Sequence, residues 1–255
     1  MKLHTRERGS GPILFILHGL FGSGDNWNSV ARGLKDRWRV VMPDLANHGQ
    51  SPHTQTYTFD SMAADLFDTA DDLGINTFSL MGHSMGGKAA MIAALSNPRR
   101  IEKLIVADVA PRGYPPRHRK VIEAMKKVRS AQVSSRQEAD RLMAEDIHDR
   151  MIRAFLLKNL VPDEGGYRWR LGLDTIDRTY DALIGWSEFE SSFSGPTLFI
   201  GGGRSNYLAG EDEPEIKRLF PQARIVTLSE AGHWIHTDEP EQFLREIRQF
   251  LAPSE

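Results

Sequence analysis

Short apolar runs alternate along this sequence with longer segments in which apolar residues recur at helical spacing. The apolar runs lie at 13–17, 38–42, 78–81, 104–107, 197–200 and 224–228. The helical patterns lie at 28–34, 59–73, 84–97, 214–219 and 240–251. Alternation of this kind predicts a mostly parallel β-sheet with helices on both faces, which is an α/β fold.

The alternation stops between residues 111 and 194. This stretch is helix-rich, shows no clear strand and contains Pro115-Pro116 and Gly165-Gly166. We interpret it as a helical cap inserted into a core formed by residues 1–110 and 195–255. Such an insertion would lie over the carboxyl ends of the strands, where open α/β sheets bind their ligands.

Composition excludes several classes of protein. The chain has 32 Lys and Arg against 34 Asp and Glu, a net charge of −2, so nucleic-acid binding driven by charge is not expected. It has no cysteine, which excludes disulfides, thiolate metal sites and a cysteine nucleophile. The first eight residues carry charges where a signal peptide would have its apolar stretch. No window of the sequence approaches the ~18 apolar residues of a membrane span. We expect a cytoplasmic protein without a membrane partner, as a monomer or small homo-oligomer.

A G-x-S-x-G pattern, Gly82-His-Ser84-Met-Gly86, follows one predicted strand and opens a predicted helix. Small residues at positions 82 and 86 allow the strained turn that exposes Ser84 above a helix N-terminus. The pattern alone is short and weak evidence. Its place between a strand and a helix favours a nucleophilic serine.

Three polar turns follow other predicted strands and supply what such a serine needs. The turn at 18–23 is flanked by glycines and can present a backbone N–H to an oxyanion, alongside that of Met85. The loop at 44–51 offers polar side chains near the site. The turn at 232–234 carries His233, and acidic residues lie between Ser84 and His233 in chain order.

With these landmarks, the sequence resembles the α/β-hydrolases over nearly its whole length. Within that superfamily it is most similar to the small bacterial YbfF-type esterases, through the motifs at 18–23, 82–88, 107–111 and 202–207. The resemblance implies the α/β-hydrolase fold, a nucleophile elbow at Ser84 and an oxyanion hole.

The acid that pairs with His233 has two candidate sources. Most α/β-hydrolases carry an Asp just beyond the strand that ends here at Ile200, but residues 201–207 contain no carboxylate. Asp108 directly follows another predicted strand, and the YbfF-type likeness supports it. Glu211 and Asp212, further along the later loop, are the alternatives. We favour Asp108 because long loops position catalytic groups less reliably than strand ends do.

These residues predict a serine esterase that cleaves short or medium acyl esters through an acyl-enzyme. Ser84 attacks, His233 transfers the proton and Asp108 orients the imidazole. The N–H groups of Leu20 and Met85 hold the oxyanion, and no cofactor is required. The substrate is expected to be a small acyl ester or thioester. An acyl-CoA thioesterase, a carbon–carbon hydrolase, a lyase or a non-enzymatic ligand sensor on the same scaffold remain alternatives.

Other side chains allow both a functional and a structural interpretation. Four aromatic candidates for the substrate pocket are Phe21, Trp186, Tyr207 and Trp234, although aromatic residues in an insertion can equally form its own core. A basic cluster at 112–129 suits either an anionic group of the substrate or a solvated helix face. One triad histidine suffices, so His18, His48 and His83 are expected to be structural. His233 and His236 lack the further ligands of a metal site.

Overall fold

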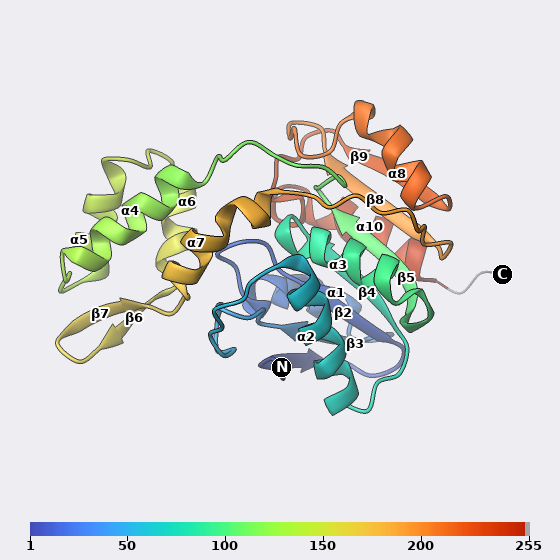
Figure 1. Ribbon diagram of the computed structural model, residues 1–255, viewed down its shortest axis with the longest axis horizontal. Coiled ribbons are helices and arrows are strands. Elements are labelled where there is room, and N and C mark those ends of the chain that lie inside the picture. Colours follow the sequence, from blue (N-terminus) through green and yellow to red (C-terminus); the bar gives the residue numbers. More distant parts are fainter. Residues whose placement is uncertain (253–255) are drawn as a thin grey trace.

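The computed structural model describes residues 1–252, which are built around a seven-stranded sheet (Figure 1). Its strands, in spatial order, are β1 (Thr5–Arg8), β3 (Arg39–Pro43), β2 (Ile13–Leu17), β4 (Phe78–His83), β5 (Ile101–Ala107), β8 (Thr197–Gly202) and β9 (Ala223–Leu228). All neighbouring strands are parallel except β1, which is antiparallel to β3. The predicted mostly parallel sheet is confirmed. The edge strand β1 was not predicted, because Thr5-Arg-Glu-Arg8 has no apolar alternation.

Helices cover both faces of the sheet, and the side-chain alternation of β2 shows how. Leu14 and Ile16 pack with buried residues of α1 (Asn28–Leu34) and α10 (Pro240–Leu251). Phe15 and Leu17 point to the other face, which is covered by α2 (Phe59–Asp72), α3 (Met85–Ser96) and α8 (Glu213–Leu219). These five helices agree with the predicted ranges to within one residue. No helix in the described part of the chain is long and apolar enough to cross a bilayer.

The segment between β5 and β8 contains four helices: α4 (Arg119–Ser130), α5 (Arg136–Ala144), α6 (Arg150–Leu157) and α7 (Leu173–Ile184). It also contains the hairpin β6 (Leu160–Asp163) and β7 (Gly166–Trp169), so the expectation of no strand here was wrong. Only the paired Leu160 and Trp169 are buried in this hairpin, which left no alternating pattern to detect. In Figure 1 the hairpin and α4–α6 lie beyond one end of the sheet, and α7 leads back to it.

Four short helical turns complete the described elements. They are η1 (Gly24–Trp27), η2 (Pro98–Arg100), η3 (Gly210–Asp212) and α9 (Ile235–Asp238). Both η1 and η3 follow the carboxyl ends of strands, and α9 follows the turn after β9. The chain therefore makes several tight turns at the same edge of the sheet.

The turn between β4 and α3 depends on close backbone packing. Ser84 has φ 53° and ψ −120°, a conformation that few non-glycine residues adopt. A Cβ atom on Gly82 would lie 2.1 Å from the carbonyl oxygen of Gly86. A Cβ atom on Gly86 would lie 2.5 Å from the carbonyl oxygen of His18. Both glycines are thus required where α3 crosses next to β2 and β4.

We predict that Gly86→Ala strongly destabilises the protein. The added methyl group meets backbone atoms of His18 and Leu17, which can move only if β2 shifts. A loss of about 2 kcal/mol or more in the free energy of unfolding is expected, measured by urea denaturation. Gly210→Ala is the matched control, since no atom lies within 4 Å of the place that its methyl group would occupy. Equal stability of the two variants would contradict the packing argument.

Candidate active site

Ser84, His233 and Asp108 form a continuous chain of hydrogen bonds at the carboxyl ends of the strands. Ser84 Oγ lies 3.1 Å from His233 Nε2, and Asp108 Oδ2 lies 2.7 Å from His233 Nδ1. The three residues follow β4, β9 and β5 respectively. A hydroxyl, an imidazole and a carboxylate in this order can activate the hydroxyl as a nucleophile.

Parallel register brings Ser84 and Asp108 to the same edge of the sheet. Within β4 and β5, His83 is opposite Ala107, so the next residues of both strands leave the sheet side by side. Ser84 N donates to Ala107 O at 3.0 Å, and Asp108 N donates to Ile200 O at 2.8 Å. Asp108, like Ser84, has a positive φ, of 49°. Each side chain is therefore directed by a strained residue immediately after a strand.

Asp108 is fully buried and its carboxylate is held on both oxygens. Gly202 N donates to Oδ1 at 2.9 Å, and Ser205 Oγ donates to Oδ2 at 2.5 Å. Ser205 lies in the loop after β8, where the sequence showed no carboxylate. Sequence reasoning did not single out Ser205 as a site residue, although it is part of the motif at 202–207. The Ser205 hydroxyl donates a hydrogen bond to the carboxylate of Asp108 and does not take the place of a carboxylate.

The alternative acids lie elsewhere. Asp212 Oδ1 is 2.6 Å from Arg112 Nε, and Asp212 Oδ2 accepts from Ala209 N at 2.8 Å. Glu211 is exposed. Neither carboxylate has His233 as a hydrogen-bond partner, so the structure brings Asp108 and not these residues to the imidazole.

Leu20 and Met85 line the same cavity as Ser84. Met85 is the first residue of α3, so its N–H has no acceptor within the helix. In the turn after β2, Phe21 N donates to His48 Nε2 at 3.2 Å and Gly22 N donates to Gly19 O at 3.0 Å. Within residues 1–252, the N–H groups of Leu20 and Met85 donate to no protein acceptor. Both are available to an oxyanion formed at Ser84.

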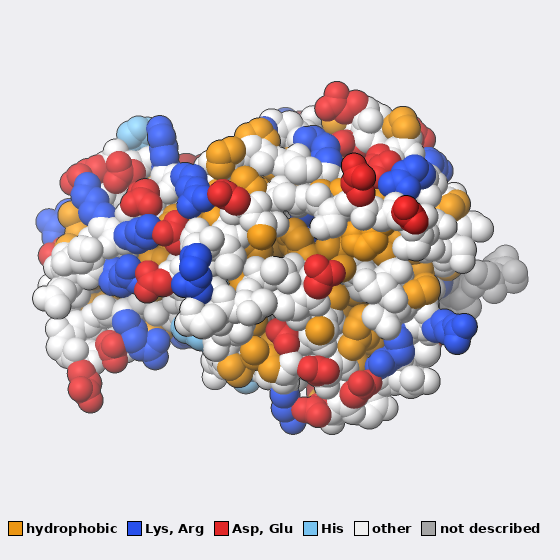
Figure 2. All heavy atoms as spheres, viewed as in Figure 1, with side chains coloured by type: hydrophobic (Ala, Val, Ile, Leu, Met, Phe, Trp, Pro, Cys, Tyr) orange, Lys and Arg blue, Asp and Glu red, His pale blue; other side chains and the backbone are white. Residues whose placement is uncertain are grey.

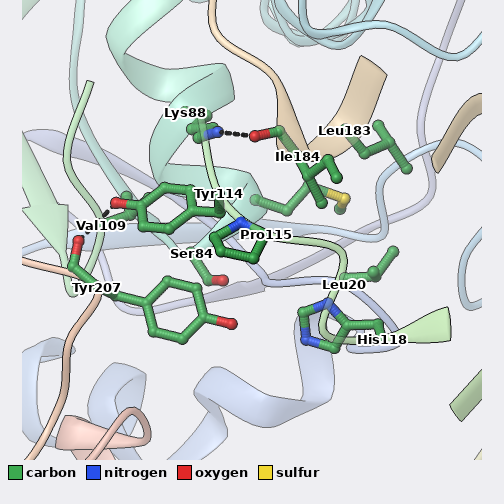
Figure 3. Close-up of a pocket in the computed structure, with 11 residues that line it drawn as sticks. Leu20, Ser84, Lys88, Val109, Tyr114, Pro115, His118, Leu183, Ile184 and Tyr207 are labelled. Carbon is green, nitrogen blue, oxygen red and sulfur yellow. Dashed lines mark hydrogen bonds between the residues drawn. The ribbon is translucent and has the colours of Figure 1, made fainter. Parts of the chain in front are cut away.

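Figure 3 shows the cavity beside Ser84, with side chains from the core and from the segment between β5 and β8. Tyr207 lines it and stacks on His233, with ring centroids 4.0 Å apart. The other three aromatic candidates are not among its lining residues: Phe21 lies edge-on to His118, Trp234 contacts Phe155 and Trp186 contacts Phe189. Lining residues that sequence reasoning missed are Lys88, Val109, Tyr114, Pro115, His118, Leu183 and Ile184. Val109 directly follows Asp108 in the motif at 107–111, but nothing in a single sequence places the other five of the last six near Ser84, because they meet it only through the fold.

Lys88 connects α3 to the end of α7. Its side chain is 2% exposed, and Nζ donates to Ile184 O at 3.0 Å and to Gly185 O at 2.6 Å. The ammonium group also lies 4.7 Å from the centre of the Tyr114 ring. Burial lowers the pKa of Lys88 to about 7. Carbonyl groups at a helix C-terminus are favourable partners for this cation.

The histidines near the site are held by hydrogen bonds or by packing. His18 Nε2 accepts from Leu45 N at 2.9 Å, and His83 Nε2 donates to the carbonyl oxygen of His233 at 2.8 Å. Burial lowers the pKa of His48 to about 3 and that of His236 to about 4, which keeps both rings neutral. His236 packs on Trp27, with centroids 4.4 Å apart. No three potential metal-ligating side chains gather in the described part of the chain.

The basic cluster at 112–129 is largely paired with carboxylates. Arg119 lies 3.0 Å from Asp177, and Arg129 lies 2.9 Å from Asp174. Further pairs are Arg112 with Asp212, Lys126 with Glu123 and Asp177, and Lys127 with Glu145. Figure 2 shows basic and acidic side chains interspersed over this end of the molecule. The arrangement matches a solvated, ion-paired helix face.

Known proteins share both the sequence and this geometry. Residues 12–240 match the alpha/beta hydrolase fold family. The chain is 42% identical to the sn-1-specific diacylglycerol lipase ABHD11 of Danio rerio, over 96% of this chain and 80% of that protein. It is 35% identical to esterase YbfF of Escherichia coli, over 98% of this chain and 99% of that protein.

A solved structure agrees with the fold in detail. The structure of a marine microorganism esterase superposes with a TM-score of 0.95 at 38% identity, covering 98% of this chain and 99% of the other. The match extends through the segment between β5 and β8 as well as the sheet. By sequence and by structure, the chain belongs to the α/β-hydrolase family.

Proposed function

We propose that Ser84, His233 and Asp108 are the catalytic triad of this carboxylic-ester hydrolase. The observation that carries the proposal is the hydrogen-bond chain from Asp108 Oδ2 through both nitrogens of His233 to Ser84 Oγ. Ser84 opens on a cavity that also holds the unpaired N–H groups of Leu20 and Met85. Related proteins are named as esterases and lipases, which supports the same chemistry here.

The geometry translates into two half-reactions. His233 Nε2 takes the proton of Ser84 Oγ while that oxygen attacks the acyl carbon, and the carbonyl oxygen becomes an oxyanion facing the N–H groups of Leu20 and Met85. The intermediate collapses, the alcohol leaves with the proton from His233, and Ser84 keeps the acyl group. Water then repeats the sequence and releases the acid. Asp108 holds the Nδ1–H tautomer and stabilises the imidazolium.

We propose further that residues 111–194 form the cap of this site and that residues 1–110 and 195–255 form its core. The cap contributes Tyr114, His118, Leu183 and Ile184 to the cavity. Its aliphatic and aromatic lining suits a short or medium acyl chain, and the lipase relatives make a glycerolipid ester a candidate. The basic side chains at 112–129 are mostly paired with carboxylates, so the cluster gives no support to an acyl-CoA substrate, whose phosphates would need free cations. A cytoplasmic location and a monomer or small homo-oligomer stay predictions.

Replacing the nucleophile tests the proposal most directly. Ser84→Ala is expected to lower kcat for p-nitrophenyl butanoate by about 10⁴-fold or more, because in residues 1–252 no other hydroxyl is hydrogen-bonded to His233 Nε2. Ser134→Ala, at an exposed position, is the matched control and retains wild-type activity. A phosphonate ester should add its mass to the wild type and the control but not to Ser84→Ala. Undiminished hydrolysis by Ser84→Ala would refute the assignment.

The acid is tested by two parallel substitutions. Asp108→Asn keeps the size of the side chain but no longer selects the Nδ1–H tautomer, so kcat is expected to fall by about 10⁴-fold. Asp212→Asn alters the contact with Arg112 and should change kcat by no more than a few-fold. Steady-state kinetics with p-nitrophenyl butanoate distinguish the two variants. The opposite ranking would place the acid in the loop after β8.

A further inference from the structure

His118 is a second histidine in the cavity, and the triad does not use it. It precedes α4, is partly buried, and lines the cavity together with Ser84, Leu20 and Tyr207. His118 Nδ1 lies 3.0 Å from the Tyr180 hydroxyl, and the backbone N–H of His118 donates to the same hydroxyl at 2.8 Å. The ring is therefore anchored by one nitrogen to α7.

These two contacts determine which ring nitrogen carries the proton. Tyr180 is fully buried, and its oxygen already accepts the backbone N–H of His118. The hydroxyl proton needs an acceptor, and His118 Nδ1 is the one at hydrogen-bond distance in the described part of the chain. Nδ1 therefore accepts, and Nε2 bears the hydrogen. Burial lowers the pKa of His118 to about 4, so the ring is neutral above about pH 5.

The Nε2–H group has no acceptor in the protein among residues 1–252. In Figure 3 the His118 ring lies next to Leu20, in the cavity that Ser84 and Tyr207 also line. Two other polar side chains of the cavity are already engaged. Lys88 Nζ donates to two carbonyl groups, and the Tyr114 hydroxyl accepts from Ala110 N and donates to Tyr207 O. His118 thus offers an unused donor in the cavity that holds the nucleophile.

We propose that His118 Nε2–H binds a second oxygen of the substrate, so that the enzyme favours esters with a carbonyl, ether or hydroxyl oxygen near the scissile group. The proposal rests on the proposed function of Ser84. A site built to donate a hydrogen bond discriminates against a substrate that lacks the acceptor, because the donor is then left unpaired. His118 is in this sense a specificity-determining residue and takes no part in bond cleavage.

Pairs of isosteric esters test the proposal on both sides of the scissile bond. For the acyl side, p-nitrophenyl 3-methoxypropanoate is compared with p-nitrophenyl pentanoate, and 4-methoxybutanoate with hexanoate. For the alcohol side, 2-methoxyethyl butanoate is compared with butyl butanoate. The readout is the ratio of kcat/KM for the ether to kcat/KM for the hydrocarbon. The two esters of a pair differ in intrinsic reactivity, but this difference is the same for every enzyme variant. It therefore cancels when the ratios of two variants are compared.

We expect His118→Leu to lower the ratio by about 10-fold for at least one pair, the loss typical of one hydrogen bond. His118→Gln retains an N–H donor and should recover part of the preference. The wild-type ratio should be constant between pH 6 and pH 9, because the ring is neutral throughout. His148→Leu, an exposed histidine of the same segment, is the matched control and keeps the wild-type ratio.

Ratios that stay the same in His118→Leu for every pair would overturn the proposal, as would an equal loss for both members of each pair. Failure of the underlying function is recognised separately, with the hydrocarbon esters. Hydrolysis of p-nitrophenyl pentanoate that survives Ser84→Ala refutes the nucleophile. Hydrolysis that depends on Ser84 but gives unchanged ratios refutes only the role of His118.

Discussion

The parallel register of β4, β5 and β8 is the constraint on which the site depends. Because His83 pairs with Ala107 and Ala107 pairs with Ile200, the chain leaves β4 and β5 at one level of the sheet, and β8 continues beside them to Gly202. Ser84 and Asp108 are the first residues beyond β4 and β5, and both have the positive φ that turns their side chains toward His233. A slip of one residue would direct each side chain to the other face.

Close packing of backbone against backbone supports this register. Gly82 and Gly86 allow the first turn of α3 to lie on β2 and β4 without a side chain between them. Met85, whose N–H has no protein acceptor among residues 1–252, lines the cavity together with Leu20. The proposed nucleophile and the proposed oxyanion donors thus arise from one packing arrangement, which is rigid because it is made of main chain.

The loop after β8 shows how the family pattern is met by different residues. Residues 201–207 include no carboxylate, yet Gly202 N at the end of β8 and Ser205 Oγ in this loop both donate to Asp108. The carboxylate comes from β5 and its hydrogen-bond donors come from β8. The proposed acid therefore follows a different strand than in most α/β-hydrolases, while it still contacts the histidine after β9.

Sequence reasoning succeeded where the signal is local. The five core helices, the strands of the parallel sheet and the G-x-S-x-G turn are encoded in apolar periodicity and in glycine spacing. It missed β1 and the β6–β7 hairpin, whose short strands bury too few residues to alternate. It also selected pocket aromatics by residue type, and only Tyr207 of the four lines the cavity.

The sequence by itself thus determined the fold class, the serine that opens α3 and the chain order of the candidate triad residues. Only the tertiary structure decided that Asp108 rather than Asp212 meets His233, and that His118 lines the cavity while its Nδ1 contacts Tyr180. Contacts between residues more than 100 positions apart, such as Asp108 with His233, depend on strand order and register. No local pattern records these distances, because they exist only after the chain has folded.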